Sequence, residues 1–213
     1  MPHLESIAER IHTSLEERTK VRDGLLSQAR TLTRHCANAI RAVHRNENEL
    51  AEKHLTEALT IVQSFREILR DHPDLYYAGY TQDALKEFAE AQIVYALINR
   101  LEPPSPEDLQ VEYATYLQGL AEAVGELRRR CLDILLKGRP EEAECLLEDM
   151  DDIYAVLVTM DYPDAITGGL RRLTDLARGI IERTRGDLTI SLRQELLQQS
   201  IQRLEERFAE PKA

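Results

Sequence analysis

The chain has 213 residues, of which 43% are hydrophobic, so it can bury a sizeable core, but no apolar run reaches the ~18 residues that a membrane span needs. Only 5% of the residues are aromatic, and the abundance of Leu, Ala, Glu and Arg favours helices over sheets. The net charge of -11 excludes a generally basic coat for nucleic acid, although a local basic strip remains compatible with it.

Prolines and glycines divide the chain into segments in which apolar residues recur every three or four positions, the period of a helix. The stretch DHPDLYYAGY (71–80) predicts a loop. Ser105 is typical of a helix N-cap, with Pro106 at the first helical position. Gly186 predicts a helix end, with Asp187 capping the next helix. The predicted helices span residues 3–45 (with an alternative break near Gly24), 47–70, 81–100, 106–137, 140–159, 163–185 and 187–208.

This pattern predicts an all-α protein, a bundle of about seven helices that forms one domain over residues 1–213. The short connections favour antiparallel neighbours. No strand or repeat is predicted. Three widely spaced cysteines fit free thiols in a reducing cytoplasm, and the polar N-terminal residues do not resemble a signal peptide.

The charge is spread unevenly along the chain. Residues 18–45 contain seven basic side chains and one acid, a balance of +6, which leaves -17 for the remainder. At about 100° per residue, four of the arginines fall within roughly 60° of one another on a helix. This cationic strip is either a solvated face or a track that binds phosphate groups. The strip consists of Arg30, Arg34, Arg41 and Arg45, with Lys20 as a further candidate.

Two pairs of glutamates stand one helical turn apart. Glu87 and Glu90 lie among apolar residues in LKEFAEAQ, and Glu122 and Glu126 lie beside small residues, which let another helix approach closely, in GLAEAVGEL. If the two helices face each other, four carboxylates converge, and they need a cation or protons to share a buried site. Exposed glutamates on good helix formers are the alternative, since this spacing alone is a weak signal.

The kind of ion follows from the donor atoms. No histidine lies after His72, and the Glu-x-x-His pairs that di-iron bundles need are absent near the four carboxylates. An all-oxygen site favours Mg²⁺ or Mn²⁺, which act on phosphate chemistry. The Gly168-Gly169 pair lacks the remainder of a phosphate-binding loop and predicts close helix packing instead.

Several stretches together resemble the translin family, and the translin-associated factor X branch with its archaeal members more than translin itself. The resemblance covers roughly residues 18–205. It is carried by RTLTRHCANAIRAVHR (30–45), LKEFAEA (85–91), GLAEAVGELRR (119–129) and DYPDAITGGLRRLTDLARGIIERTRGDLT (161–189).

The resemblance implies an all-α protomer that assembles into a hollow homo-octamer. It also implies binding of single-stranded RNA, and of single-stranded DNA, with metal-dependent endoribonuclease activity. The site residues carried over by motif are Glu87, Glu90, Glu122 and Glu126, which would hold Mg²⁺ or Mn²⁺. The family pattern usually has Asp where this chain has Glu122, a change that moves the ligand oxygen by about 1 Å or more.

Two other functions remain open from the sequence. One is a translin-like scaffold that binds single-stranded nucleic acid without cutting it, which Glu122 in place of Asp favours. The other is a helical, Mg²⁺-dependent NTP pyrophosphohydrolase, which also uses acidic pairs on helices. The long basic segment and the stretch 161–189 count against the second alternative.

Overall fold

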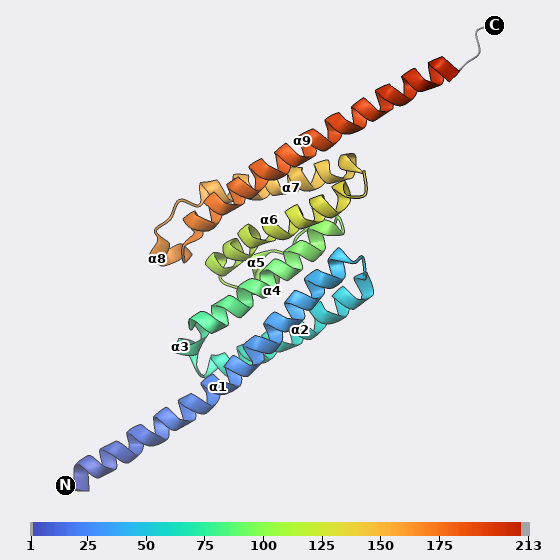
Figure 1. The fold of residues 1–213 in the computed structure, drawn as a ribbon. Helices are drawn as coiled ribbons and strands as arrows, with labels where there is room; N and C mark the ends of the chain where they lie inside the picture. The colour runs from blue at the N-terminus through green and yellow to red at the C-terminus, as the bar shows by residue number, and fades with distance from the viewer. Residues whose placement is uncertain (1, 210–213) are drawn as a thin grey trace.

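The computed structural model describes residues 2–209, and within this range the chain is all-α, without strands (Figure 1). Six long helices carry the fold: α1 (Pro2–His44), α2 (Asn48–Arg70), α4 (Gly79–Ile98), α6 (Tyr113–Leu135), α7 (Pro140–Thr159) and α9 (Leu170–Ala209). Three helices of one turn lie in the connections: α3 (Pro73–Tyr76), α5 (Pro106–Leu109) and α8 (Asp164–Thr167). No helix in the described range is both long and apolar enough to cross a membrane.

The long helices stack in sequence across the molecule. The hairpin of α1 and α2 packs on α4, α4 packs on α6, and α6 packs on α7 and α9. One large hydrophobic core runs through all of these layers, with Leu32, Phe88 and Leu127 among its fully buried side chains. The first part of α1 and the last part of α9 extend beyond the bundle at opposite ends (Figure 1). The single-domain organisation over residues 1–213 stays a prediction, because residues 1 and 210–213 lie outside the described range.

The direction of the helices follows the length of their connections. The pairs α1/α2, α6/α7 and α7/α9 run antiparallel, as short connections predict (Figure 1). The α4 and α6 helices instead run parallel, because residues 99–112 return along the bundle before α6 begins. The parallel register is visible in two contacts between them, from Gln82 to Thr115 and from Lys86 to Glu122.

Two glycines that could have ended helices do not. The α1 helix runs unbroken through Gly24, and α9 runs unbroken through Gly186, so the predicted boundary at 185–187 is wrong. A glycine costs a helix only ~1 kcal/mol, and packing offsets that cost. The buried Thr184 and Leu188 flank Gly186 and hold both sides of α9 in the bundle.

The segment 106–137 was predicted as one helix and is two. Ser105 caps α5 as predicted, in a capping box with Asp108. Gln110 then adopts a left-handed conformation (φ 50°) that ends α5 after one turn. The predicted end of α6 is confirmed, because Gly138 has a positive φ of 68° and Pro140 begins α7.

Candidate metal centre and its surroundings

Close contact between α4 and α6 creates the candidate site. A Cβ atom on Gly119 would lie 2.9 Å from the backbone oxygen of Lys86 and 3.0 Å from the backbone nitrogen of Glu90. Only glycine therefore allows this approach, as the small residues of the segment predict. Gly125 has open space at its Cβ position and plays no such part.

The two predicted glutamate pairs do face each other across this contact. Glu87, Glu90 and Glu122 each offer a carboxylate oxygen within 4.8 Å of the others, a spacing that one ion can bridge. The longer side chain of Glu122, where the family pattern has Asp, still reaches the group. Glu126 lies beside these three without joining the group. We call Glu87, Glu90 and Glu122 the acidic cluster.

Glu90 is the most buried member, with 9% of its surface exposed. Burial, together with the charges of Glu87, Glu122 and Glu126, raises the pKa of Glu90 to about 8. Near neutral pH the acidic cluster alone therefore holds a proton at Glu90, and a divalent cation would replace it. Among the described residues Glu90 forms no ion pair, and a buried carboxylate of this kind fits an ion-binding group.

Lys86 is a neighbour of the acidic cluster that the sequence analysis missed. Its Nζ lies 2.7 Å from Glu122 Oε2 and 3.6 Å from Glu87 Oε1. Burial works to lower the pKa of Lys86, but the hydrogen bond to Glu122 and the nearby acids raise it above its ordinary value. The ammonium group therefore stays charged and neutralises part of the acidic cluster.

His44 is the second neighbour that the sequence analysis missed. His44 Nε2 lies 2.6 Å from Glu126 Oε2, although 82 positions separate the two residues. This hydrogen bond lowers the pKa of Glu126, and Arg129 at 3.8 Å adds to the effect. The sequence offered one indication of His44, because it lies near the end of RTLTRHCANAIRAVHR (30–45), a stretch that carries the family resemblance. No Glu-x-x-His pair is involved, so the acidic cluster remains all-oxygen.

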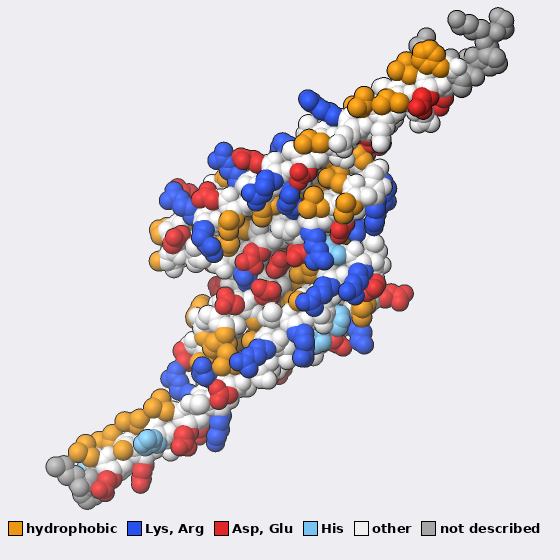
Figure 2. All heavy atoms as spheres, in the orientation of Figure 1, with side chains coloured by type: hydrophobic (Ala, Val, Ile, Leu, Met, Phe, Trp, Pro, Cys, Tyr) orange, Lys and Arg blue, Asp and Glu red, His pale blue; other side chains and the backbone are white. Residues whose placement is uncertain are grey.

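The basic residues predicted to bind phosphate groups are all exposed: Lys20, Arg30, Arg34 and Arg41 lie on α1, and Arg45 directly follows its end. Arg41 donates a hydrogen bond to Asn38 (2.8 Å), and no ion pair forms at any of the five among the described residues. Figure 2 shows Lys and Arg side chains along α1 on the same face as a group of acidic side chains over α4 and α6. The basic strip is thus exposed to solvent and forms no ion pair among the described residues.

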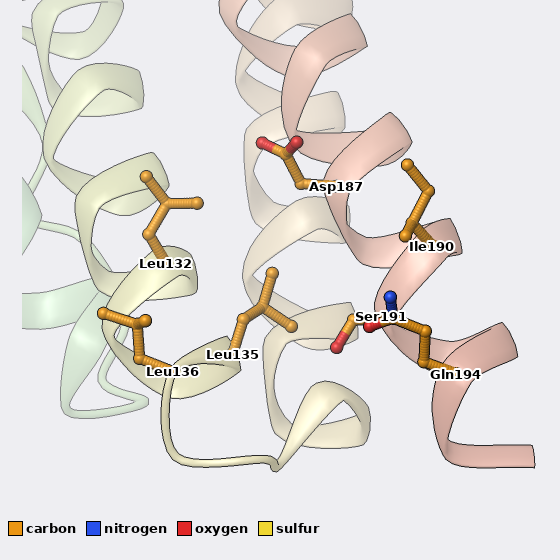
Figure 3. A pocket seen from close by; sticks show the side chains of 7 residues that line it. All are labelled: Leu132, Leu135, Leu136, Asp187, Ile190, Ser191 and Gln194. Carbon is orange, nitrogen blue, oxygen red and sulfur yellow. The ribbon is translucent and has the colours of Figure 1, made fainter. Parts of the chain in front are cut away.

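Two other features carry no comparable chemistry. A pocket of about 460 Å³ between the end of α6 and α9 is lined by three leucines of α6 and its C-cap and by four residues of α9, and its Asp187 is paired with Arg128 at 2.9 Å (Figure 3). Gly168, with φ 60°, ends α8 where Gln118 of α6 donates to the carbonyl oxygen of Thr167 at 2.9 Å. The close-packing prediction for this glycine pair is confirmed at Gly168, and the neighbouring Gly169 has open space at its Cβ position.

The fold and the sequence of this chain are similar to those of known proteins. The chain is similar to AfC3PO from Archaeoglobus, in a structure with duplex RNA, at 34% identity and a TM-score of 0.81 over 88% of this chain and 97% of that one. It is also similar to apo-NeC3PO from Nematostella, at 24% identity and a TM-score of 0.77 over 90% and 98% of the two chains. An uncharacterized protein of Methanocaldococcus jannaschii is 30% identical in an alignment 201 residues long that covers 90% of this chain and 85% of that relative. No protein-family model matches the chain.

The fold therefore defines an all-α protomer of the kind found in C3PO, the complex of translin and translin-associated factor X. The chain belongs to the translin family.

Proposed function

We propose that this chain is a cytoplasmic, metal-dependent endoribonuclease of the translin family that cleaves single-stranded RNA. The observation that carries the proposal is the convergence of Glu87, Glu90 and Glu122 within 4.8 Å, with Glu90 buried. Such a site is costly for a folded protein unless a cation uses it. Its all-oxygen donor set fits Mg²⁺ or Mn²⁺.

Each glutamate then has a role. Glu87, Glu90 and Glu122 would hold the ion, which would supply positive charge for the phosphodiester oxygens and acidify a water. Glu126 lies at the edge of the acidic cluster, oriented by His44, and accepts a proton from the attacking water. Lys86 holds Glu122 in place and adds positive charge near the phosphate.

The strip of Lys20, Arg30, Arg34, Arg41 and Arg45 would hold the RNA backbone. Guanidinium groups bind phosphate oxygens in pairs, and the strip is exposed and without ion pairs among the described residues. The relative AfC3PO has been captured with duplex RNA, which supports RNA as the ligand class. Single-stranded RNA is the proposed substrate and single-stranded DNA a further ligand.

We also propose a homo-octamer. The projecting end of α1 exposes Leu4, Ile11 and Leu15, each more than half exposed. The projecting end of α9 likewise exposes Leu197, Ile201, Leu204 and Phe208, each by 46% or more. Apolar rows of this kind are typical of surfaces that another chain covers. Light scattering on the purified protein should therefore give the mass of eight chains, and the mass of one chain would refute the assembly.

A binding scaffold without nuclease activity is the second candidate. The contact of 2.7 Å between Lys86 and Glu122 favours it, because the ammonium group already occupies one side of the acidic cluster. The pyrophosphohydrolase alternative has no support from the relatives.

Cleavage of labelled RNA tests the proposal. Single-stranded RNA, its duplex and single-stranded DNA are incubated with the protein in Mg²⁺, Mn²⁺ or EDTA. We expect metal-dependent cleavage of the single strand and a loss of at least about 10²-fold in Glu122→Gln. Glu144→Gln removes an exposed carboxylate of α7 and should keep full activity. Intact RNA in every reaction, with binding retained in a gel shift, would instead establish the scaffold.

A further inference from the structure

A second group of metal-binding side chains lies between α1 and α2, away from the carboxylates of α4 and α6. It consists of His35 on α1 and of His54 and Glu57 on α2, and we call it the histidine cluster. His54 and Glu57 stand three residues apart, so both point from one face of α2 toward α1. Figure 2 shows histidine side chains over α1 and α2, apart from the acidic group.

The distances within the histidine cluster match those between ligands of one ion. His35 Nδ1 lies 3.2 Å from His54 Nδ1 and 2.8 Å from Glu57 Oε2, and His54 Nδ1 lies 3.6 Å from that same oxygen. Ligands bound to zinc at about 2.0–2.1 Å in a tetrahedron lie about 3.3–3.4 Å from each other. The three atoms therefore form nearly one face of such a tetrahedron.

Hydrogen bonding alone accounts poorly for this arrangement. One N–H on His35 cannot point at both the carboxylate of Glu57 and the ring nitrogen of His54. The two rings are also tilted by 54° at a centroid separation of 5.3 Å, so they are not stacked. A cation at the centre would accept a lone pair from all three atoms at once.

The surroundings leave room for one more ligand. The two histidine side chains are each 19% exposed, whereas that of Glu57 is 43% exposed. The ring nitrogens are thus shielded, and water can reach the open side. A site with three protein ligands and one water is a common arrangement for zinc.

We propose that His35, His54 and Glu57 form a zinc site that joins α1 to α2, with water as the fourth ligand. Imidazole nitrogen selects zinc or a similar transition metal over Mg²⁺, so this site and the acidic cluster take different ions. Along α1 the site lies about 13 Å from His44, as nine residues rise about 1.5 Å each. The proposal does not depend on nuclease activity.

Cobalt spectroscopy on the metal-free full chain tests the proposal. Co²⁺ is titrated in excess Mg²⁺, which fills the all-oxygen site. Four-coordinate Co²⁺ with nitrogen ligands gives strong visible bands, whereas six-coordinate Co²⁺ with oxygen ligands gives weak ones. We expect strong bands that saturate at one Co²⁺ per chain and disappear when Zn²⁺ is added. Zinc at about a hundredfold excess over its Kd should also raise Tm by roughly 5–10 °C.

Three variants make the result specific. His54→Ala should lose the bands and the Tm shift. Glu57→Gln keeps a hydrogen-bond acceptor for His35, so it should fold normally and still bind Co²⁺ at least about tenfold more weakly. His12→Ala removes an exposed histidine of α1 and should behave as the wild type. Absence of strong bands in the wild type, or bands that survive in both cluster variants, would overturn the proposal and leave a hydrogen-bonded group without a metal.

Discussion

The acidic cluster between α4 and α6 and the histidine cluster between α1 and α2 use the same helical scaffold in different ways. In the first, three carboxylates converge where Gly119 lets two helices touch, and Glu90 is 9% exposed. In the second, two imidazoles and a carboxylate meet at a more open hairpin. Both are groups of three donor atoms within 4.8 Å.

The difference lies in the electrostatic cost of each group. The acidic cluster accumulates like charge, so it holds a proton at Glu90 and an ammonium group at Lys86 when no other cation is present. The histidine cluster carries one carboxylate and two groups that are neutral unless protonated, so little charge opposes its formation. Burial and charge, more than the number of donor atoms, therefore distinguish the acidic cluster from the histidine cluster.

Glu90→Gln should give the largest change in stability. Because folding raises the pKa of Glu90 from 4.5 to about 8, the free energy of unfolding of the metal-free protein falls as pH rises between these values. The neutral amide removes this penalty. We expect a gain of about 2–4 kcal/mol near pH 8 that disappears near pH 4.5, measured by urea unfolding. Glu57→Gln serves as the comparison from the histidine cluster, and an equal gain there would contradict the contrast in burial.

Gly119→Ala tests the helix contact that forms the acidic cluster. The added methyl group meets the α4 backbone at about 3 Å, so we expect a loss of about 1–3 kcal/mol in unfolding free energy and weaker Mn²⁺ binding. The strong cobalt bands of the histidine cluster should not change. Gly125→Ala is the matched control on the same helix and should stabilise the protein by about 0.5–1 kcal/mol. If Gly119→Ala left the free energy of unfolding and Mn²⁺ binding unchanged, α4 and α6 would separate easily at this contact.

Arg30→Gln tests the basic strip on α1. It should give the smallest of the expected effects, a change in the salt dependence of RNA binding. Removing one phosphate contact should lower the slope of log K against log salt for single-stranded RNA by about 0.7. Fluorescence anisotropy at several salt concentrations measures this slope. Arg193→Gln, at an exposed arginine of α9, should leave it unchanged. Equal effects of the two variants would remove the strip as a specific binding surface.

Helix periodicity was enough to predict the all-α fold, but it left open whether the two glutamate pairs face each other or lie exposed. The end of α6 and the start of α7 followed from Gly138 and Pro140, because local backbone geometry decides them. The continuity of α9 through Gly186 was not predictable in the same way, since it depends on packing by Thr184 and Leu188. The parallel course of α4 and α6 depends on the path of residues 99–112, which carries little periodic signal.

In the candidate site, too, local sequence predicted some features, and contacts between distant segments decided the others. The spacing within each helix indicated Glu87, Glu90, Glu122 and Glu126. Long-range contacts decided their partners, and neither Lys86 at Glu122 nor His44 at Glu126 follows from spacing. The histidine cluster was missed because His35 and His54 lie on different helices, and only the hairpin brings them together.

Diffraction from crystals grown with Mn²⁺ tests the central claim most directly, because the anomalous signal locates the ion. We expect a Mn²⁺ peak bounded by Glu87, Glu90 and Glu122, with Glu126 still hydrogen-bonded to His44. A map without a peak there, or with Mn²⁺ only at His35, His54 and Glu57, would contradict the assignment of the acidic cluster as the divalent-ion site.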